Sequence, residues 1–146
     1  MRKLNFELIP ENMWYCNLRH ILTKKQWDEI RKVQIEKHEC KCAICNRKVK
    51  KLECHELWNF DEENSTQTLI DVIPLCGICH RTIHIGHAAI IGKLEECLDY
   101  YCSINKCTED ECIKDYEAAF KIWNERNKIK WKLNIEWINN ILKTPN

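Results

Sequence analysis

Two pairs of cysteines have the spacing of a tetrahedral metal site. Cys42 and Cys45 enclose two residues in "CAIC", and Cys76 and Cys79 enclose two residues in "CGIC". A C-x2-C turn directs two thiolates toward one ion, and two such turns complete a four-sulfur shell. Zinc has no redox chemistry of its own, and a closed four-thiolate shell leaves no position for water. We therefore expect these cysteines to bind a structural zinc ion that cross-links the chain.

Three histidines nearby have the types and spacing of a second, catalytic site. His80 and His84 are four residues apart, so on a helix both imidazoles face one side and can bind one metal ion. His55 lies in "ECHE", within a segment that we expect to be a strand. Neutral imidazole, with an ordinary pKa of about 6.5, accepts a proton near neutral pH. The alternative is structural: His55 packs within the strand, and His80 bonds a backbone carbonyl or a zinc thiolate.

The remaining cysteines leave other assignments open. Cys40 lies two residues before Cys42 and competes with it as a ligand, although the C-x2-C spacing favours Cys42. A thioredoxin-like redox pair would need a strand-to-helix context, which the first cysteine pair lacks. Four later cysteines recur every five residues, a spacing that on one helix rotates too far to converge on one ion. We expect these four to lie in the core or in loops: Cys97, Cys102, Cys107 and Cys112.

Composition limits the class of protein. The 146 residues fit one domain, and a formal net charge of +1 gives no argument for an acidic, nucleic-acid or membrane partner. The three glycines form no phosphate-binding loop, which excludes Walker and Rossmann sites. Eleven cysteines without a signal sequence indicate reduced thiols rather than disulfides. Because apolar runs such as Leu69 to Cys76 are too short to span a bilayer, we expect a soluble cytoplasmic protein without membrane contact.

The elements that must position these residues follow from periodicity and capping. Thr23 and Gln26 form a capping box that predicts a helix over Lys24–Lys37, with one apolar face made of Trp27, Ile30 and Val33. Next come two strand candidates, Lys51–Leu57 and Leu69–Leu75, which a long polar loop over Asp61–Gln67 would join into a hairpin.

Helices are expected again after the second cysteine pair. One covers Cys79–His87, and a second covers Ala89–Cys102 with a stripe of Ile90, Leu94, Leu98 and Tyr101. A third begins after Thr108, which forms a capping box with Glu111. Since no linker or repeat divides the chain, we predict a single α+β domain over 1–146. Its parts are a helical segment over 1–39, the zinc core over 40–88 and a helical segment over 89–146.

Local charge and aromatic residues give a weaker indication of nucleic-acid binding. "NRKVKK" after the first cysteine pair contains four basic residues, Arg47, Lys48, Lys50 and Lys51, that a loop can present to phosphates. The alternative is a solvated turn. The six tryptophans can stack on bases, but in a small domain we expect most of them to anchor the core.

The order of "CAIC", "ECHELW" and "DVIPLCGICHRTIH" resembles the HNH nuclease family, over about Cys42 to His87. That family has a ββα-metal fold held by two C-x2-C knuckles. The flanking "NFELIP", "QWDEIRK", W-x2-R and W-x-L-x-I elements resemble a small bacterial and phage-borne subfamily. The resemblance implies that His55 is the general base, and that His80 and His84 bind a catalytic Mg, Mn or other divalent ion beside the structural zinc.

Two positions depart from the family pattern. Cys54 stands where an Asp or His metal ligand is common, and a thiolate ligand would shift the preference toward softer ions. Asp71 stands where the family has its middle Asn. There it would keep an oxygen acceptor for orienting His55 but lose the amide donor. Glu53 or Glu56 is an alternative ligand.

Three functions remain open from the sequence. The resemblance implies a metal-dependent DNA endonuclease. The alternative is a catalytically inactive HNH-like zinc module that binds nucleic acid or a protein partner, for example a phage-encoded inhibitor of a host nucleoprotein defence complex. A purely structural or redox role leaves the placement of the histidines unexplained. No segment marks a dimer seam, and a phage origin would place the protein in the bacterial host cytoplasm.

Overall fold

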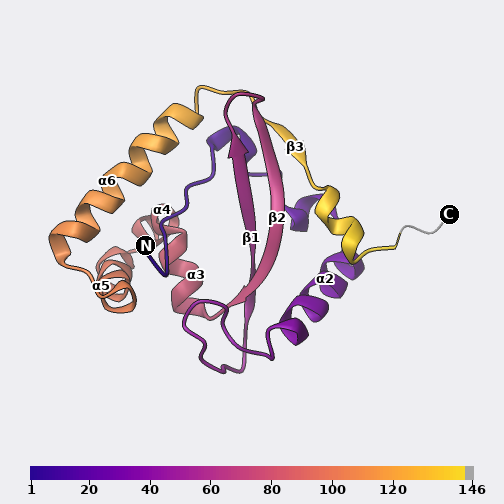
Figure 1. Cartoon of the computed structure of the whole chain (residues 1–146), viewed down its shortest axis with the longest axis horizontal. Helices are drawn as coiled ribbons and strands as arrows, with labels where there is room; N and C mark the ends of the chain where they lie inside the picture. Colours follow the sequence, from indigo (N-terminus) through magenta and orange to yellow (C-terminus); the bar gives the residue numbers. More distant parts are fainter. Residues whose placement is uncertain (144–146) are drawn as a thin grey trace.

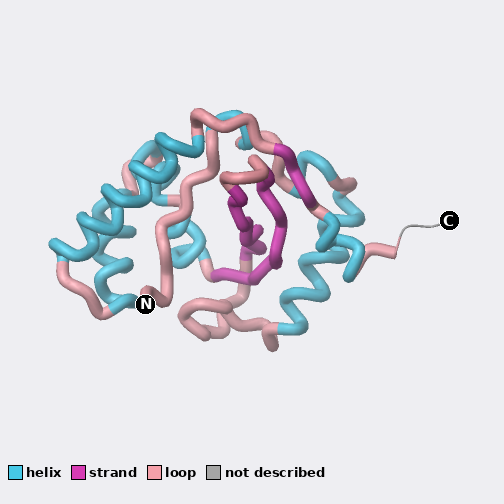
Figure 2. Tube along the Cα trace, turned by 45° about the horizontal axis from the view of Figure 1, so that its top comes forward, coloured by secondary structure: helices cyan, strands magenta, loops and turns pink. Residues whose placement is uncertain are grey.

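A long antiparallel hairpin runs through the centre of the molecule in the computed structural model, which describes residues 1–143 (Figure 1). Its strands β1 (Glu53–Asp61) and β2 (Thr66–Leu75) pair from Glu53 opposite Leu75 to Asp61 opposite Thr66. The described helices are η1 (Glu11–Met13), α1 (Leu18–Ile21), α2 (Lys24–Lys37), α3 (Gly77–Ile83), α4 (Ile85–Ile90), α5 (Leu94–Asn105), α6 (Glu109–Arg126) and η2 (Glu136–Asn140). Helix α2 lies on one side of the hairpin, and α3 to α6 lie on the other (Figures 1 and 2). The described chain is therefore mixed α+β.

The hairpin is longer, and its turn tighter, than the hydrophobic pattern predicted. The expected loop over Asp61–Gln67 shrinks to a short turn, because Asp61 Oδ1 accepts a hydrogen bond from the Asn64 backbone N–H at 3.1 Å. Ser65 adopts a left-handed φ of 51°, which reverses the chain into β2. Local turn chemistry thus extends β1 to Asp61 and starts β2 at Thr66, beyond the apolar segments from which the strands were predicted.

Helix α2 has the predicted bounds but a different buried face. Its Thr23 and Gln26 form the predicted capping box. Val33, expected in the core, is 39% exposed, whereas the neighbouring Gln34 is only 2% exposed. The amide Nε2 of Gln34 donates to the carbonyl oxygen of Val72 at 2.8 Å and to the Asp71 carboxylate at 3.1 Å. A polar side chain is buried here because strand β2 supplies both of its acceptors.

The helices after β2 divide differently from the prediction. The single helix expected over Cys79–His87 breaks at His84, which has φ −86° and ψ 58° between α3 and α4. The helix expected over Ala89–Cys102 begins only at Leu94, because Gly92 has a φ of 76° that ends the preceding turn. Ile90 is therefore exposed instead of belonging to the buried stripe. Helix α6 begins at the predicted capping box of Thr108 and Glu111.

The C-terminal segment, expected to be helical over 89–146, also contributes a strand. Strand β3 (Lys132–Asn134) pairs in parallel with the start of β2, so the sheet in residues 1–143 has the order β1-β2-β3. Trp131 holds this strand in place, since its indole N–H donates to the Arg126 carbonyl at 2.9 Å and its ring meets the Phe60 ring edge-on. Residues 144–146 of the expected helical segment lie outside the described part.

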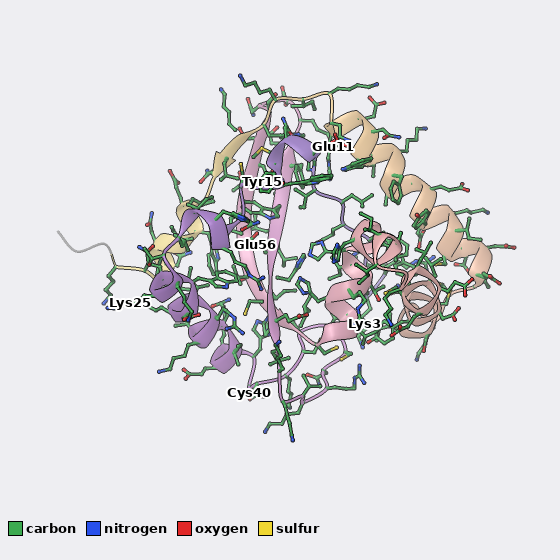
Figure 3. All side chains as sticks on the ribbon, turned by 180° about the vertical axis from the view of Figure 1, so that it is seen from behind. Lys3, Glu11, Tyr15, Lys25, Cys40 and Glu56 are labelled. Carbon is green, nitrogen blue, oxygen red and sulfur yellow. The ribbon has the colours of Figure 1, made fainter. Side chains whose placement is uncertain are left out.

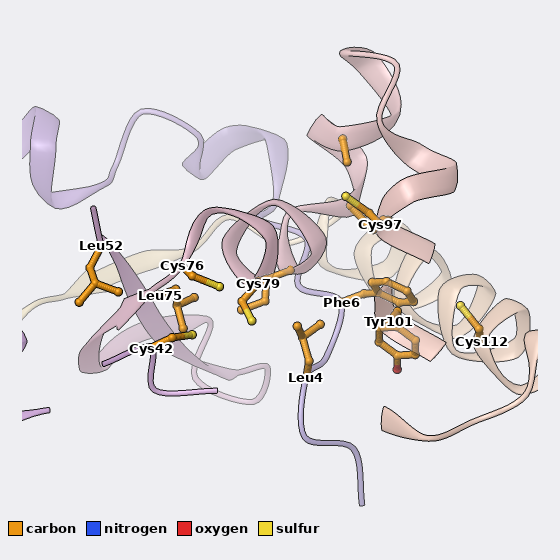
Figure 4. Close-up of a cluster of buried hydrophobic side chains, with 13 residues drawn as sticks. Leu4, Phe6, Cys42, Leu52, Leu75, Cys76, Cys79, Cys97, Tyr101 and Cys112 are labelled. Atoms are coloured by element: carbon orange, nitrogen blue, oxygen red, sulfur yellow. The ribbon is translucent and has the colours of Figure 1, made fainter. Parts of the chain in front are cut away.

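The extended N-terminal segment packs against the helices that follow β2. Phe6 stacks on Tyr101 of α5 with ring centroids 4.0 Å apart, within a buried cluster that also contains Leu4 and three of the paired cysteines (Figure 4). The backbone N–H of Glu7 donates to the Ile83 carbonyl at 2.9 Å. This backbone hydrogen bond fixes the extended segment beside the end of α3. Within residues 1–143, the helices lack the combination of length and apolar sequence needed to cross a membrane.

Candidate metal centres

The four paired cysteines form one cluster, which we call the four-cysteine cluster. The sulfur atoms of Cys42, Cys45, Cys76 and Cys79 all lie within 4.8 Å of one another. Cys45 Sγ and Cys76 Sγ are 3.7 Å apart. Four sulfurs bound at about 2.3 Å at the corners of a tetrahedron are separated by about 3.8 Å, whereas a disulfide bond is about 2.05 Å long. The cluster therefore lies within metal-binding distance and is consistent with structural zinc.

Local backbone bonds shape the first knuckle of this cluster. The Cys42 N–H donates to the Arg47 carbonyl at 3.0 Å, and the Asn46 N–H donates to the Cys42 carbonyl at 2.9 Å. Asn46 closes the turn with a left-handed φ of 63°. Ala43 N–H donates to the Pro74 carbonyl at 2.8 Å, which fixes the knuckle to the end of β2. Cys40 is exposed and is not a member of the cluster.

Neighbouring donors compensate the charge that thiolates would carry. A hydrogen bond from Cys79 lowers the pKa of Cys42 to about 4. The Arg47 guanidinium donates to the Cys45 sulfur at 3.3 Å and lies 3.7 Å from the Cys76 sulfur. The Tyr100 hydroxyl of α5 is 3.0 Å from the Cys79 sulfur and can donate to it. Such partners in the outer shell stabilise bound metal.

The basic segment predicted to contact phosphates is thus divided. Arg47 is directed at the four-cysteine cluster, while Lys48, Lys50 and Lys51 are exposed. None of these four basic residues is among those that line the cavity above the histidines. In Figure 3, Cys40 is labelled near the end of the hairpin where β1 begins, and Tyr15 is labelled toward the other end.

The three predicted histidines also converge, into what we call the histidine cluster. His55 comes from β1, His80 from α3 and His84 from the break between α3 and α4. One nitrogen of each imidazole lies within 4.8 Å of the others, and the ring centroids are 4.8 to 5.4 Å apart. The predicted spacing of four residues brings His80 and His84 together, and the hairpin adds His55.

Carboxylates contact two of these imidazoles, each at one ring nitrogen. Glu7 Oε2 lies 2.5 Å from His55 Nε2, which leaves Nδ1 of that ring for another partner. Glu53 Oε2 lies 3.0 Å from His80 Nδ1, which leaves Nε2. A carboxylate on one ring nitrogen fixes the tautomer and orientation of a metal-binding histidine. Both rings therefore have the environment of metal ligands or of an oriented base.

Burial keeps two of the three imidazoles, those of His80 and His84, uncharged. Desolvation lowers the pKa of His84 to about 3, and the neighbouring histidines add to this effect. Desolvation also lowers the pKa of His80, against the opposing influence of Glu53. A neutral imidazole has a free lone pair, which is the form that binds metal ions. The donor set fits a divalent ion that accepts nitrogen ligands.

Cys54 and Asp71 lie outside the histidine cluster. Cys54 lines the adjacent cavity, but burial raises the pKa of its thiol, and it does not join the ligand atoms that converge. The Asp71 carboxylate accepts from Gln34 and from the Val72 backbone N–H at 2.8 Å. The expected role of Asp71 in orienting His55 thus falls to a different carboxylate, Glu7.

A cavity of about 260 Å³ opens above the histidines. It lies between the strands and the N-terminal segment that includes η1 and α1, where Tyr15 and Glu56 are labelled in Figure 3. Glu56 is held there by the Leu18 backbone N–H, which donates to it at 2.6 Å, and burial raises the pKa of this carboxyl group. The histidine cluster is thus reachable by a ligand, whereas the cysteines are largely covered by the core.

Sequence reasoning missed two residues that contact the clusters. Glu7 belongs to the extended "NFELIP" segment, which has no periodicity that could assign its carboxylate to a histidine 48 residues away. Tyr100 lies in α5 outside any ligand motif.

In comparisons with protein-family profiles, curated proteins and solved structures, nothing matches this chain.

Proposed function

We propose that this protein is a metal-dependent nuclease of the HNH type, which hydrolyses DNA phosphodiester bonds at the histidine cluster. The observation that carries the proposal is the convergence of three imidazoles, two of them held by carboxylates, beneath an accessible cavity. Structural zinc in the four-cysteine cluster completes the proposed site, because Cys79 is followed directly by His80 in α3.

In this proposal His80 and His84 hold a divalent ion that accepts imidazole ligands, such as Ni²⁺, Zn²⁺ or Mn²⁺, in preference to Mg²⁺. Their nitrogens lie close together and are neutral, as ligands must be. Such an ion would neutralise the phosphate and stabilise the departing 3′ oxygen. The carboxylate of Glu53 keeps the His80 ring turned so that its Nε2 is available.

His55 acts as the general base. Its Nε2–H donates to Glu7, so the lone pair on Nδ1 accepts a proton from water. The water oxygen forms a bond to phosphorus, and the bond from phosphorus to the 3′ oxygen breaks. The positive charge that His55 gains is stabilised by the Glu7 carboxylate beside it. The His55 side chain of this pair is buried, while the Glu7 side chain is 36% exposed.

The test is nicking of supercoiled plasmid at low salt with Mg²⁺, Mn²⁺, Ni²⁺ or Zn²⁺ added separately. His55→Ala should lose cleavage while keeping the divalent metal and the zinc. His87→Ala is the matched control, because His87 is exposed on α4 and is not part of the cluster. Full activity in His55→Ala contradicts its role as base. If the wild type contains zinc in the four-cysteine cluster but cleaves the plasmid with none of the added metals, the inactive binding module is favoured instead.

A further inference from the structure

The cavity above the histidine cluster extends past groups that the proposed hydrolysis does not use. It is lined by the indoles of Trp14, Trp27 and Trp58, and Arg19 supplies the guanidinium among its lining residues. Indole faces bind flat rings, and a guanidinium binds phosphate or stacks on an aromatic ring. The lining therefore matches a ligand that joins a planar ring to an anion.

These groups are held in place without closing the cavity. The Trp14 N–H donates to the Ile9 carbonyl at 2.8 Å, yet the residue is 52% exposed, so its ring is fixed while part of its surface stays free. Trp58 follows a register shift in the β1–β2 pairing, and such a bulge redirects side chains. The Arg19 guanidinium carbon lies 6.0 Å from the centroid of the Trp27 ring.

A buried acceptor without a partner lines the same cavity. Gln67 is 1% exposed, and its Oε1 accepts no hydrogen bond from the described residues. Leaving such an atom unpaired costs about 1–3 kcal/mol, and native proteins rarely tolerate this cost without a compensating partner. Because Oε1 itself is covered by neighbouring atoms, the Gln67 amide has to turn toward the cavity for an N–H donor on a ligand to satisfy it.

We propose that this cavity binds one unstacked base of a nucleic-acid strand, with Trp14 and Trp58 against the ring, Gln67 accepting a base N–H and Arg19 on an adjoining phosphate. Every base carries an amino or imino N–H on its edge. At about 260 Å³ the cavity is smaller than the ~300–1,000 Å³ of ordinary small-molecule sites, so it suits one ring system. The inference rests on the proposed function, because it places the base beside the phosphate to be cleaved.

The experiment compares two short, fluorescently labelled duplexes by anisotropy, without added divalent metal. One contains a single unpaired nucleotide, and the other has an abasic residue at the same position; both are made in DNA and in RNA. The wild type should bind the unpaired nucleotide roughly tenfold more tightly than the abasic residue, as expected for one stacked base. Whether the DNA or the RNA version binds more tightly then identifies the type of strand.

Three variants test whether this difference in affinity between the two duplexes arises in the cavity. Trp14→Ala should lose most of the preference for the base. Tyr15→Ala should keep it, because the neighbouring Tyr15 is 77% exposed and does not line the cavity. Gln67→Met preserves size but removes the acceptor, so it should lower base-dependent binding by a few-fold while melting no earlier than the wild type.

The outcomes separate this inference from the proposed function. It is overturned if the wild type binds neither duplex, if it binds both equally, or if Trp14→Ala and Tyr15→Ala behave alike. Plasmid cleavage together with equal binding of both duplexes supports the nuclease and overturns the base site. Base-dependent binding without cleavage in any metal supports the base site and contradicts the nuclease.

Discussion

At the scale of single residues, the carboxylates of Glu7 and Glu53 give the histidine cluster its orientation. Each contacts one nitrogen of an imidazole and leaves the other ring nitrogen available. We predict that Glu53→Gln lowers the affinity for divalent metal and that Glu7→Gln lowers the cleavage rate, each by roughly 10- to 100-fold, because an amide orients imidazole less strongly than a carboxylate. Calorimetric titration with Mn²⁺, alongside plasmid nicking, measures both effects.

The matched control for these substitutions is Glu63→Gln in the exposed hairpin turn, which makes the same change in charge away from the cluster. Metal affinity should be unchanged in this variant. If all three variants bind metal equally and cleave equally, the two carboxylates do not act on the cluster.

Prediction from sequence succeeded for residues that follow a recognisable ligand spacing. Each C-x2-C pair and the four-residue spacing of His80 and His84 bring two side chains together locally, and the predicted hairpin between the two cysteine pairs brings those pairs together. The contact of Glu7 with His55 depends on where an extended segment crosses the fold, and this is fixed by a backbone bond to Ile83. No local pattern in the sequence carries that information.

At the scale of elements, a buried amide attaches α2 to the sheet. Gln34 donates to the Val72 carbonyl and to the Asp71 carboxylate. We predict that Gln34→Ala lowers the free energy of unfolding by about 1–3 kcal/mol, because it leaves buried acceptors unpaired. Urea unfolding measures this change. Lys32→Ala on the exposed face of α2 should stay within about 0.5 kcal/mol of the wild type, and an equal loss in both variants would contradict the assignment.

Elements were predictable where capping fixed their ends. Thr23 and Thr108 begin α2 and α6 as predicted. The break at His84 was not predictable, because the residues from Cys79 to His87 have the periodicity of one continuous helix. Strand β3 was missed for a related reason: three residues are too few for a pattern, and the strand forms only by pairing with the distant start of β2.

At the scale of the whole molecule, α3 links the two clusters. The four-cysteine cluster holds the N-terminal end of α3 through Cys76 and Cys79, and the same short helix presents His80 to the cavity. The first knuckle is fixed to the end of β2, and the strand paired with β2 carries His55. A metal ion bound by the cysteines would therefore constrain both elements that form the histidine cluster.

This coupling predicts that losing zinc also disables the second site. Cys42→Ser should lose zinc and lower the melting temperature, because zinc binding contributes directly to folding. It should also abolish divalent binding at the histidines, although no histidine is changed. Cys40→Ser is the control: Cys40 is exposed outside the cluster, so zinc content, measured by atomic emission, should stay at one ion per chain. If Cys40→Ser loses zinc and Cys42→Ser retains it, then Cys40 is the zinc ligand and Cys42 is not. Intact metal binding at the histidines of zinc-free Cys42→Ser would show that α3 keeps its position without the cysteine site.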